Sequence, residues 1–364
     1  MLQNFTLLRA TISKDQRLRS VKSVLLWVRR NYSSNQNDFA VISFYKFTQL
    51  NNPRSLVELV RSHLEQIDAK GRIYVNKVGI NAQMCLPSEH QKQTEIFFCD
   101  NICENIDFKT QFSDFQVFNR LRIRHGKLLE GLDENFDSKS CGDQLTAREW
   151  NLMMENKDEN TVLLDVRNKY EWEIGHFKDS VKPEFRTFNE FLNYAEKISN
   201  TINKDKKIMM YCTGGIRCEL FSSVLKNKGF ENVYQLKGGI LEYGAQSETN
   251  QWRGKLFVFD DRLVVPISEN TGSEDEIISK CSHCGAPADT CYNCNNISCN
   301  NVFTACVDCA FKFSASCSEA CCEASGKKLD KFLRRNKSQL NYKNTVGRGK
   351  HFRDIAKQFG VTIH

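Results

Sequence analysis

Hydrophobic and polar positions follow one pattern from residue 38 to 128 and another from residue 144 onward. In the first stretch, strands that alternate apolar and polar residues are separated by segments whose apolar residues recur at helical spacing. The predicted elements are a strand at 39–47, a helix at 55–67 behind Pro53, two strands within 71–87, a helix at 89–105 and a strand at 118–126. The order βαββαβ predicts a ferredoxin-like domain over residues 38–128.

The second stretch, 144–266, has short uninterrupted aliphatic strands between amphipathic helices. Such strands are typical of a parallel sheet that helices cover on both faces. The expected elements are helices at 145–156, 188–198 and 217–229, and strands at 161–167, 206–212 and 232–236. A polar segment at 129–143 is the predicted linker between the two domains. The chain is therefore predicted to combine α+β and α/β architecture.

The loop at 212–217 reads CTGGIR and directly follows a buried strand, at the sheet edge where open α/β sheets bind ligands. Gly214 and Gly215 allow successive backbone N–H groups to point inward as an anion-binding nest. The following helix directs its positive end at the loop, and Arg217 adds a cation. These features favour a reactive thiolate at Cys212. The alternative is a buried structural cysteine before an ordinary glycine turn.

Sixteen cysteines are present, and ten of them lie between residues 281 and 322. Zinc prefers four thiolates in a tetrahedron, and a C-x-x-C knuckle supplies two of them. Eight thiols in knuckle-like pairs suit two structural zinc ions within a Cys-rich module at 275–325. The proposed ligands are Cys281, Cys284, Cys294, Cys299, Cys306, Cys309, Cys317 and Cys321. Their pairing stays open, as do a single zinc with spare cysteines and, in an oxidising compartment, disulfides.

Cys291 and Cys322 would then be spare, and His283 inside the first knuckle is expected to point outward. With every zinc position filled by a thiolate, no coordination site is open for catalysis, so the expected role of the metal is structural.

The net charge of +7 is unevenly distributed. Residues 1–33 hold seven Lys or Arg against one Asp, and residues 327–364 hold eleven against two, which leaves 33 cations and 41 anions between them. Basic ends on an acidic body raise an anionic partner as a hypothesis. The basic tail, 326–364, interleaves aromatic residues with its cations, as RNA contacts do, although a disordered solvating tail has the same composition.

The first 33 residues are rich in Arg and Ser and nearly free of acids, which predicts a mitochondrial presequence and a location in the mitochondrial matrix. A disordered basic arm, a gene-model extension and a plastid transit peptide are the alternatives, with plastid or cytoplasmic locations. The clean apolar run Val24 to Val28 is far too short to span a bilayer, and no later run is longer, so we expect a soluble protein without a membrane partner.

Several charged side chains near strand ends allow two interpretations. Arg120, Arg122 and Arg124 share one face of a predicted strand, which is either a solvated face or a phosphate-contacting stripe. Lys237, before two glycines, either meets a phosphate or is a solvated lysine beside a turn.

The segment FVFDDR contains Asp260, Asp261 and Arg262, which either orient a substrate or hold the segment in place as an Asp–Arg pair. The second interpretation is favoured. His176 is expected to pack and hydrogen-bond near the sheet edge and not to act as a general base.

The loop and its surroundings resemble a rhodanese domain. CTGGIR follows an apolar strand and precedes a helix, and DVRNKYEWEIGHFKDS matches the Asp-x-Arg, Glu and Gly-His segment of that fold. The resemblance implies that Cys212 is the persulfide-forming position and Arg217 the loop arginine, with Cys218 where serine is common. It further implies an anion-binding loop and supporting residues, namely Thr213, Gly214, Gly215 and Ile216 in the loop and Asp165, Arg167, Cys218, Asp260, Asp261 and Arg262 around it.

Across residues 38–322 the chain is similar to the rhodanese-containing tRNA uridine hydroxylases, the TrhO family. The segments that carry this likeness are YCTGGIRCE, VYQLKGGILEY, FVFDDR and GRIYVNKVGINAQ. Two residues depart from it, since Val78 stands where bacterial members often have Glu and Leu220 where Lys is usual. The resemblance implies oxidation of the wobble uridine of tRNA to 5-hydroxyuridine, with the anticodon region of tRNA as partner.

Two other functions stay open from the residues alone. One is a sulfurtransferase in which Cys212 carries a persulfide, and the other is a non-catalytic rhodanese and zinc scaffold. No flavin or nicotinamide motif is present in the sequence, so the oxidant of a hydroxylation is unknown, with dioxygen one candidate. The oligomeric state is not predicted.

Overall fold

A computed structural model describes residues 38–129, 136, 140–185, 190–246, 251–268 and 277–326 of the chain. The predicted presequence at 1–33 and residues 327–364 of the predicted basic tail lie outside these residues. Among the helices that are described, none combines the length and the apolar character needed to cross a membrane.

The N-terminal domain is a five-stranded sheet in the order β4-β1-β3-β2-β5. Its elements are β1 (Phe39–Phe47), α2 (Pro53–Gln66), β2 (Lys70–Asn76), β3 (Gly79–Pro87), the 3-10 turn η1 (Ser88–His90), α3 (Gln91–Asn101), β4 (Lys109–Ser113) and β5 (Leu121–His125). The first four strands are antiparallel, and β5 adds to β2 in parallel. The predicted ferredoxin-like fold is therefore present.

One strand of this domain was assigned wrongly from the sequence. The fourth strand of the βαββαβ unit is β4, whereas the predicted strand at 118–126 is β5, a fifth strand on the opposite edge. β4 has the sequence KTQFS, with Phe112 exposed, so it shows no buried apolar alternation that a hydrophobic pattern could reveal.

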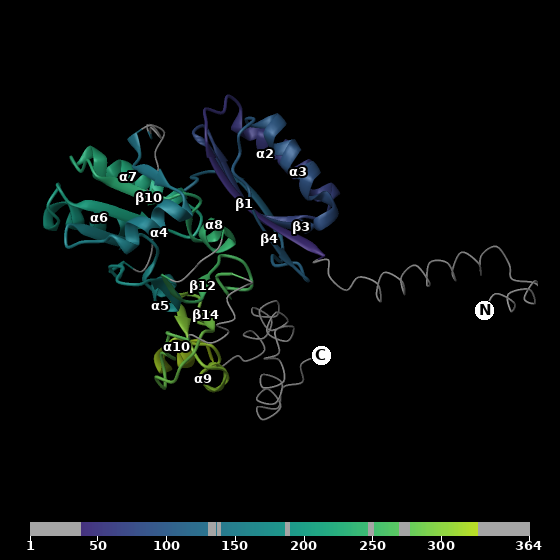
Figure 1. The fold of residues 1–364 in the computed structure, drawn as a ribbon. Coiled ribbons are helices and arrows are strands. Elements are labelled where there is room, and N and C mark those ends of the chain that lie inside the picture. Colours follow the sequence, from purple (N-terminus) through teal and green to yellow (C-terminus); the bar gives the residue numbers. More distant parts are fainter. Residues whose placement is uncertain are drawn as a thin grey trace, which may run out of the picture. The chain divides into compact units, whose positions relative to one another are not determined.

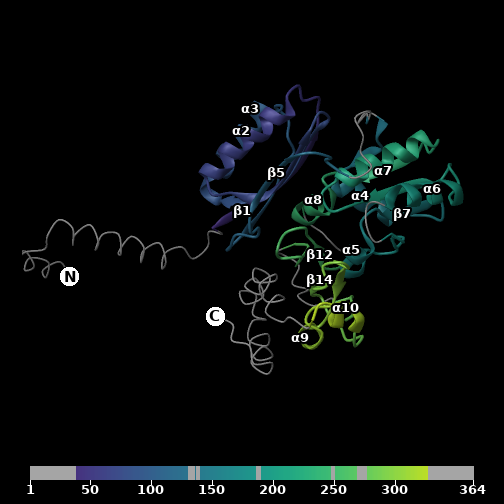
Figure 2. The same ribbon diagram turned by 180° about the vertical axis from the view of Figure 1, so that it is seen from behind.

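Helices α2 and α3 cover one face of this sheet, as Figures 1 and 2 show from opposite sides. Their apolar residues Val60, Leu64 and Phe98 pack on strand residues such as Ile42 and Ile73. Because side chains alternate along a strand, the residues between these core positions point to the other face of the sheet.

The second domain contains a four-stranded parallel sheet in the order β6-β10-β9-β7. Its elements are β6 (Asp143–Leu145), α4 (Ala147–Glu155), β7 (Thr161–Asp165), α5 (Lys169–Ile174), β8 (Gly175–Phe177), α6 (Phe191–Thr201), β9 (Lys207–Tyr211), α7 (Ile216–Asn227), β10 (Val233–Leu236) and α8 (Gly239–Gln246). The short edge strand β6 was not predicted.

Both faces of the parallel sheet are buried, which explains its continuous aliphatic strands. Along β9, Ile208 and Met210 pack with α6 and α7, whereas Met209 and Tyr211 face α4 and α8. The strand therefore delivers the next residue, Cys212, into the protein interior at its carboxyl end.

The described chain after α8 forms two two-stranded ribbons, β12-β13 and β14-β15, and the second of these belongs to the Cys-rich module. The elements are β11 (Trp252–Gly254), β12 (Leu256–Phe257), β13 (Val264–Val265), β14 (Cys291–Asn293), β15 (Val302–Thr304), α9 (Val307–Lys312) and α10 (Glu319–Ala324). β11 pairs with β8, which ties the chain after α8 back to the second domain.

Phe177 is the centre of an aromatic cluster in the second domain, with edge or tilted ring contacts to Trp150, Tyr211, Tyr243 and Trp252. We predict that Phe177→Ala lowers the free energy of unfolding by about 3–5 kcal/mol, because it removes buried area and leaves a cavity. Chemical denaturation measures this loss. Leu152→Ala on the exposed face of α4 is the control, with an expected change within about 0.5 kcal/mol.

Candidate active site

The loop after β9 turns tightly around the Cys212 sulfur. Gly215, the residue before α7, has φ +102°, a conformation that favours glycine, and its amide donates a hydrogen bond to Sγ of Cys212 at 3.1 Å. The sulfur thus lies at the N-terminus of a twelve-residue helix, where unpaired amides and the helix dipole favour negative charge.

The Cys212 thiol is fully buried, and burial by itself opposes its ionisation. Hydrogen bonds from the Cys218 side chain, the positive charge of Arg217 and the amides of Cys218 and Gly215 outweigh that effect and lower the pKa of Cys212 to about 6. At neutral pH the sulfur is therefore a thiolate.

Cys218 serves as the partner thiol. Burial and its contact with the Cys212 sulfur raise the pKa of Cys218 well above the usual value, so it remains a protonated donor. One sulfur of the pair is charged and the other neutral, and serine, which is common here in rhodanese domains, would fill the same donor role.

The Arg217 guanidinium is held by a buried carboxylate. Its Nη1 and Nη2 donate to the two oxygens of Glu171 at 2.6 and 2.9 Å, and Nη2 also donates to Oγ1 of Thr213 at 3.0 Å. Thr213 in turn donates to Glu171 at 3.2 Å. Although burial opposes ionisation of Glu171, the charge of Arg217 holds its pKa below the ordinary value. The Arg217–Glu171 pair holds the loop in place together with Thr213, and the positive charge of Arg217 stabilises the Cys212 thiolate.

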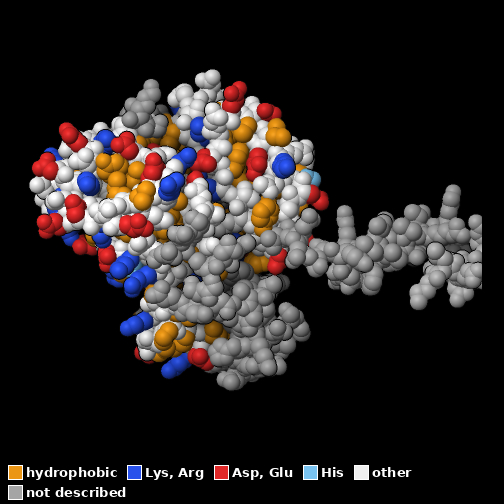
Figure 3. Space-filling model, in the orientation of Figure 1, with side chains coloured by type: hydrophobic (Ala, Val, Ile, Leu, Met, Phe, Trp, Pro, Cys, Tyr) orange, Lys and Arg blue, Asp and Glu red, His pale blue; other side chains and the backbone are white. Residues whose placement is uncertain are grey.

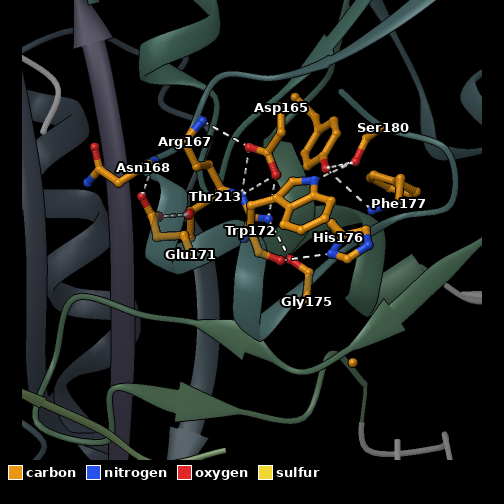
Figure 4. A network of polar contacts seen from close by, with 12 residues as sticks. Asp165, Arg167, Asn168, Glu171, Trp172, Gly175, His176, Phe177, Ser180 and Thr213 are labelled. Atoms are coloured by element: carbon orange, nitrogen blue, oxygen red, sulfur yellow. Dashed lines mark hydrogen bonds and ion pairs between the residues drawn. The ribbon is translucent and has the colours of Figure 1, made fainter. Parts of the chain in front are cut away.

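Asp165 and Arg167 form a second buried pair next to the first. Arg167 donates through Nε and Nη2 to the Asp165 carboxylate and through Nη2 to the Gly175 carbonyl at 2.6 Å, as Figure 4 shows. Both side chains are fully buried. The pair joins the end of β7 to the turn between α5 and β8.

Glu171 was missed as a site residue by the sequence analysis, although the quoted rhodanese-like segment contains it. Glu171 is the third residue of α5 and closes a capping box, in which its Oε2 accepts from the Asn168 amide at 2.9 Å. The spacing Asn-x-x-Glu at the start of α5 is the signal that could have placed it.

His176 donates from Nδ1 to the Trp172 carbonyl at 2.8 Å and stacks on the Trp172 ring. Burial lowers the pKa of His176, which favours its neutral form. Its hydrogen bond and its ring contact are both with Trp172, so the geometry assigns it a packing role.

The glycines after Lys237 bring α8 against the loop. Gly238 and Gly239 have φ +65° and +68°, and a side chain on Gly239 would lie 2.6 Å from the Cys212 carbonyl oxygen. The amide of Ile240 donates to that oxygen at 3.0 Å. These glycines therefore permit a close backbone approach, while Lys237 itself is exposed.

Tyr45 from the N-terminal sheet reaches the same loop and was not predicted. Its hydroxyl donates to Oε1 of Glu219 at 3.1 Å, and a side chain built on Gly215 would lie 2.9 Å from that hydroxyl. Glu219 is buried and also accepts from Gln144 at 2.8 Å and Gln235 at 3.2 Å. Burial, followed by the charge of Glu219, raises the pKa of Tyr45, so it stays a neutral donor.

Gly214 is the most open point of the loop. It is half-buried, and a side chain placed on it would meet nothing within 4 Å, whereas Cys212 beside it is fully buried. A reactant that approaches the sulfur therefore has room on the Gly214 side of the loop.

Asp260, Asp261 and Arg262 lie in the segment after β12, which contacts the N-terminal domain. Arg262 donates to both oxygens of Asp260, at 2.8 and 2.6 Å, and to Gln111 of β4 at 3.2 Å. Asp261 accepts from Asn119 at 2.6 Å. The three residues thus attach the chain after β12 to the N-terminal domain.

The eight predicted metal ligands gather into two groups of four thiols. The first group is Cys281, Cys284, Cys306 and Cys309, and the second is Cys294, Cys299, Cys317 and Cys321, with sulfur atoms within 4.8 Å of one another in each group. The first knuckle-like pair thus combines with the third, and the second with the fourth, a crossed pairing that the sequence analysis left open.

The sulfur spacing fits a tetrahedral metal. Sγ–Sγ distances of 3.8 Å for Cys284–Cys306 and 3.6 Å for Cys299–Cys317 match the edge of about 3.8 Å expected for metal–sulfur bonds of about 2.3 Å. They are far longer than a disulfide bond of about 2.0 Å, and all these cysteines are free. Two four-cysteine metal sites are therefore compatible with the fold.

The other candidates in the module take no part in these groups. Cys291 and Cys322 are buried outside them, and His283 contacts the Ser316 carbonyl at 2.9 Å and stacks on Phe313. The geometry gives these three side chains packing roles.

Three protein families match successive parts of the chain. Residues 39–128 match the UPF0176 acylphosphatase like domain, residues 146–246 the rhodanese-like domain, and residues 253–322 the rhodanase C-terminal family.

Full-length relatives also match. A tRNA uridine(34) hydroxylase of Chlamydia felis is 40% identical over 295 residues, which are 79% of this chain and 89% of the relative. The protein of the same name from Protochlamydia amoebophila is 39% identical over 288 residues, 78% of this chain and 88% of the relative. Among solved structures, the rhodanese-like domain of the Anabaena protein Alr3790 is 23% identical, with a TM-score of 0.26, over 30% of this chain and 78% of that one.

These relatives contradict the predicted location in the mitochondrial matrix. They come from Chlamydia and Protochlamydia, which are bacteria and have no such compartment. The prediction rested on the Arg-rich and Ser-rich composition of residues 1–33, and composition of this kind is shared by basic segments that target nothing.

The groups around the Cys212 sulfur predict how the reactivity of this thiol depends on pH. Below pH 6 the thiol is protonated and unreactive, so alkylation of Cys212 by iodoacetamide should rise through a midpoint near pH 6 and level off above pH 7. Cys218→Ala removes a hydrogen bond to the thiolate and should move the midpoint about one unit higher. Peptide mass spectrometry follows the modification.

Cys103→Ala is the control, because Cys103 lies in the N-terminal domain and is not one of the groups that set the pKa of Cys212. A wild-type midpoint near that of free cysteine, about 8.5, would contradict the assignment of a stabilised thiolate.

Proposed function

The chain belongs to the tRNA uridine(34) hydroxylase family of enzymes, and we propose that it places a hydroxyl group on C5 of uridine 34, the wobble base of the tRNA anticodon. Full-length relatives of that name support the reaction. The observation that carries the proposal on this chain is the buried thiolate of Cys212, held by Cys218, Gly215 and the charge of Arg217.

A thiolate can activate the uracil ring. In the proposed step the Cys212 sulfur adds to C6, which forms a C–S bond and moves the C5–C6 electron pair to an enolate with carbanion character at C5. C5 then takes an OH group from a hydroperoxide-type donor, whose other oxygen leaves as an alcohol. Loss of the C5 proton expels the sulfur and restores the double bond, so one oxygen is transferred and the thiolate is regenerated. With dioxygen as donor, two further electrons and protons are required, and water is the second product.

The loop contributes charge stabilisation to this step. Its amides at the start of α7 face the sulfur and can stabilise the negative charge that shifts onto the oxygen at C4 of the uracil. Arg217 is occupied by Glu171, so we assign it a positioning role that acts through the Cys212 thiolate. The Asp165–Arg167 pair supports the same sheet edge.

We assign the two four-cysteine groups to zinc with a structural role. Zinc prefers thiolate ligands in a tetrahedron, and four cysteines leave no open position for a substrate. The module around them has a small core of residues such as Tyr292 and Phe311, so metal binding is expected to supply much of its stability.

A sulfurtransferase is the second candidate, because a thiolate in this loop can carry a persulfide equally well. Nucleoside mass spectrometry separates the two. We predict that tRNA from cells with Cys212→Ser loses 5-hydroxyuridine and its derivatives at least a hundredfold, because the alcohol is not ionised at neutral pH. Cys322→Ser, a buried cysteine outside the loop and the two metal groups, is the control. Unchanged 5-hydroxyuridine with loss of thiolated bases, or of thiosulfate:cyanide activity, would favour the sulfurtransferase.

Metal analysis tests the zinc assignment. We predict two zinc ions per chain, and one after Cys309→Ser or after Cys299→Ser, because each change removes a ligand from one group only. Inductively coupled plasma mass spectrometry of purified protein gives the stoichiometry. Cys291→Ser should retain both ions, and a stoichiometry of one in the wild type would contradict the assignment of both groups to zinc.

A further inference from the structure

The face of the N-terminal sheet that α2 and α3 leave uncovered carries a row of cations. The strand register places Lys109, Ser43, Gln83, Arg72 and Arg122 opposite one another across five strands. The neighbouring row on the same face runs through Tyr45, Asn81, Tyr74 and Arg124. Neither row contains a carboxylate. At the β4–β1 end Lys109 pairs with Asp107 and Tyr45 donates to Glu219, so the cations without an ion pair among the described residues lie at the β2–β5 end.

The arginines at the β2–β5 side of these rows are available to a ligand. Arg72, Arg122 and Arg124 are exposed, whereas Ile73 and Ile123 between them are buried under the helices. Arg72 lies over the Phe118 ring at 5.9 Å. Within the described residues, no ion pair or hydrogen bond occupies the guanidinium of Arg122 or Arg124.

The described surface seen in Figure 3 mixes acidic and basic side chains. Among the described residues, no acidic side chain forms an ion pair with Arg122 or Arg124, so their charge is available to an anionic ligand.

The same rows lead to the Cys212 loop. Tyr45 begins the second row, and its hydroxyl lies against Gly215 and Glu219. Tyr74, in the same row, packs against the core cluster that contains Cys212. Three strand spacings of about 4.8 Å separate Tyr45 from Arg124, so the arginines lie roughly 14 Å from the point where the sheet meets the loop.

We propose that Arg72, Arg122 and Arg124 bind phosphates of the tRNA anticodon loop next to the nucleotide whose base enters the Cys212 site. The inference rests on the proposed function, which requires uridine 34 to leave the base stack and reach the sulfur. Guanidinium groups bind phosphates through paired hydrogen bonds, and such contacts set the register of a nucleic acid on a protein. In this proposal the three arginines hold the RNA backbone, while the Cys212 loop holds the base of uridine 34.

The register on the sheet favours RNA over an acidic peptide. The cations share this face with Gln83, whose neutral amide can hydrogen-bond to bases and riboses. An acidic peptide would use the charges alone.

The test compares two double variants of the full-length protein with matched charge. Arg122→Ala/Arg124→Ala removes one cation from each of the two rows. Arg54→Ala/Lys92→Ala removes two exposed cations from α2 and α3 on the opposite face. Affinity for a tRNA with U34 is measured as a function of salt, and 5-hydroxyuridine is measured in the same tRNA. Each lost phosphate contact should reduce the slope of log K against log[salt] by about 0.7–0.9, so the first variant should lose about 1.5 and bind at least tenfold more weakly.

Arg122→Lys/Arg124→Lys keeps both charges and should keep most of the slope, which shows that a loss in the alanine variant comes from charge and not from misfolding. Equal slopes in the alanine variant and the α2/α3 control would overturn the inference, as would equal competition by polyglutamate and by RNA of the same charge. If the wild type shows the arginine-dependent slope but forms no 5-hydroxyuridine, the phosphate site stands and the proposed reaction fails.

Discussion

A negative sulfur inside a protein is the constraint on which the rest of this site depends. Water cannot solvate Cys212, so fixed donors must do so, and they come from the helix start, from Cys218 and from the charge of Arg217. That arginine is itself buried and would be costly alone. Glu171 supplies its counter-charge, and breaking such a buried pair costs about 3–5 kcal/mol. Each buried charge at the loop is therefore stabilised by the opposite charge next to it.

The same logic reaches into the N-terminal domain. Glu219 follows Cys218 on α7, is buried, and receives its hydrogen bonds from neutral donors, namely Gln144, Gln235 and Tyr45. A carboxylate next to a thiolate would repel it, so donors that turn toward Glu219 reduce the negative potential at the sulfur. Tyr45 is one of them, and it also limits the space at Gly215. Through Tyr45, the acylphosphatase-like domain thus contributes to the Cys212 loop.

Much of this architecture could be predicted from the sequence, because burial imposes local periodicity. The strand ending at Tyr211 and the loop at 212–217 were placed by an apolar run and two glycines. The features that the sequence did not reveal depend on contacts between residues that lie far apart in the chain. Tyr45 and Glu219 are 174 positions apart, and no spacing rule connects them. The strand β4 is a polar edge strand, so it lacks a hydrophobic signature. The cysteine groups were found by composition, but their crossed pairing needed coordinates.

Crossed pairing has a consequence that spacing cannot show. If neighbouring cysteine pairs each shared a metal, the module could form as two independent halves along the chain. With the first pair joined to the third and the second to the fourth, the segment 294–299 lies between ligands of the first group, and 306–309 between ligands of the second. Neither site can then close without constraining the other, since each loop that one metal closes contains ligands of its partner. Two bound ions would hold one small core together, and the loss of either would loosen both sites.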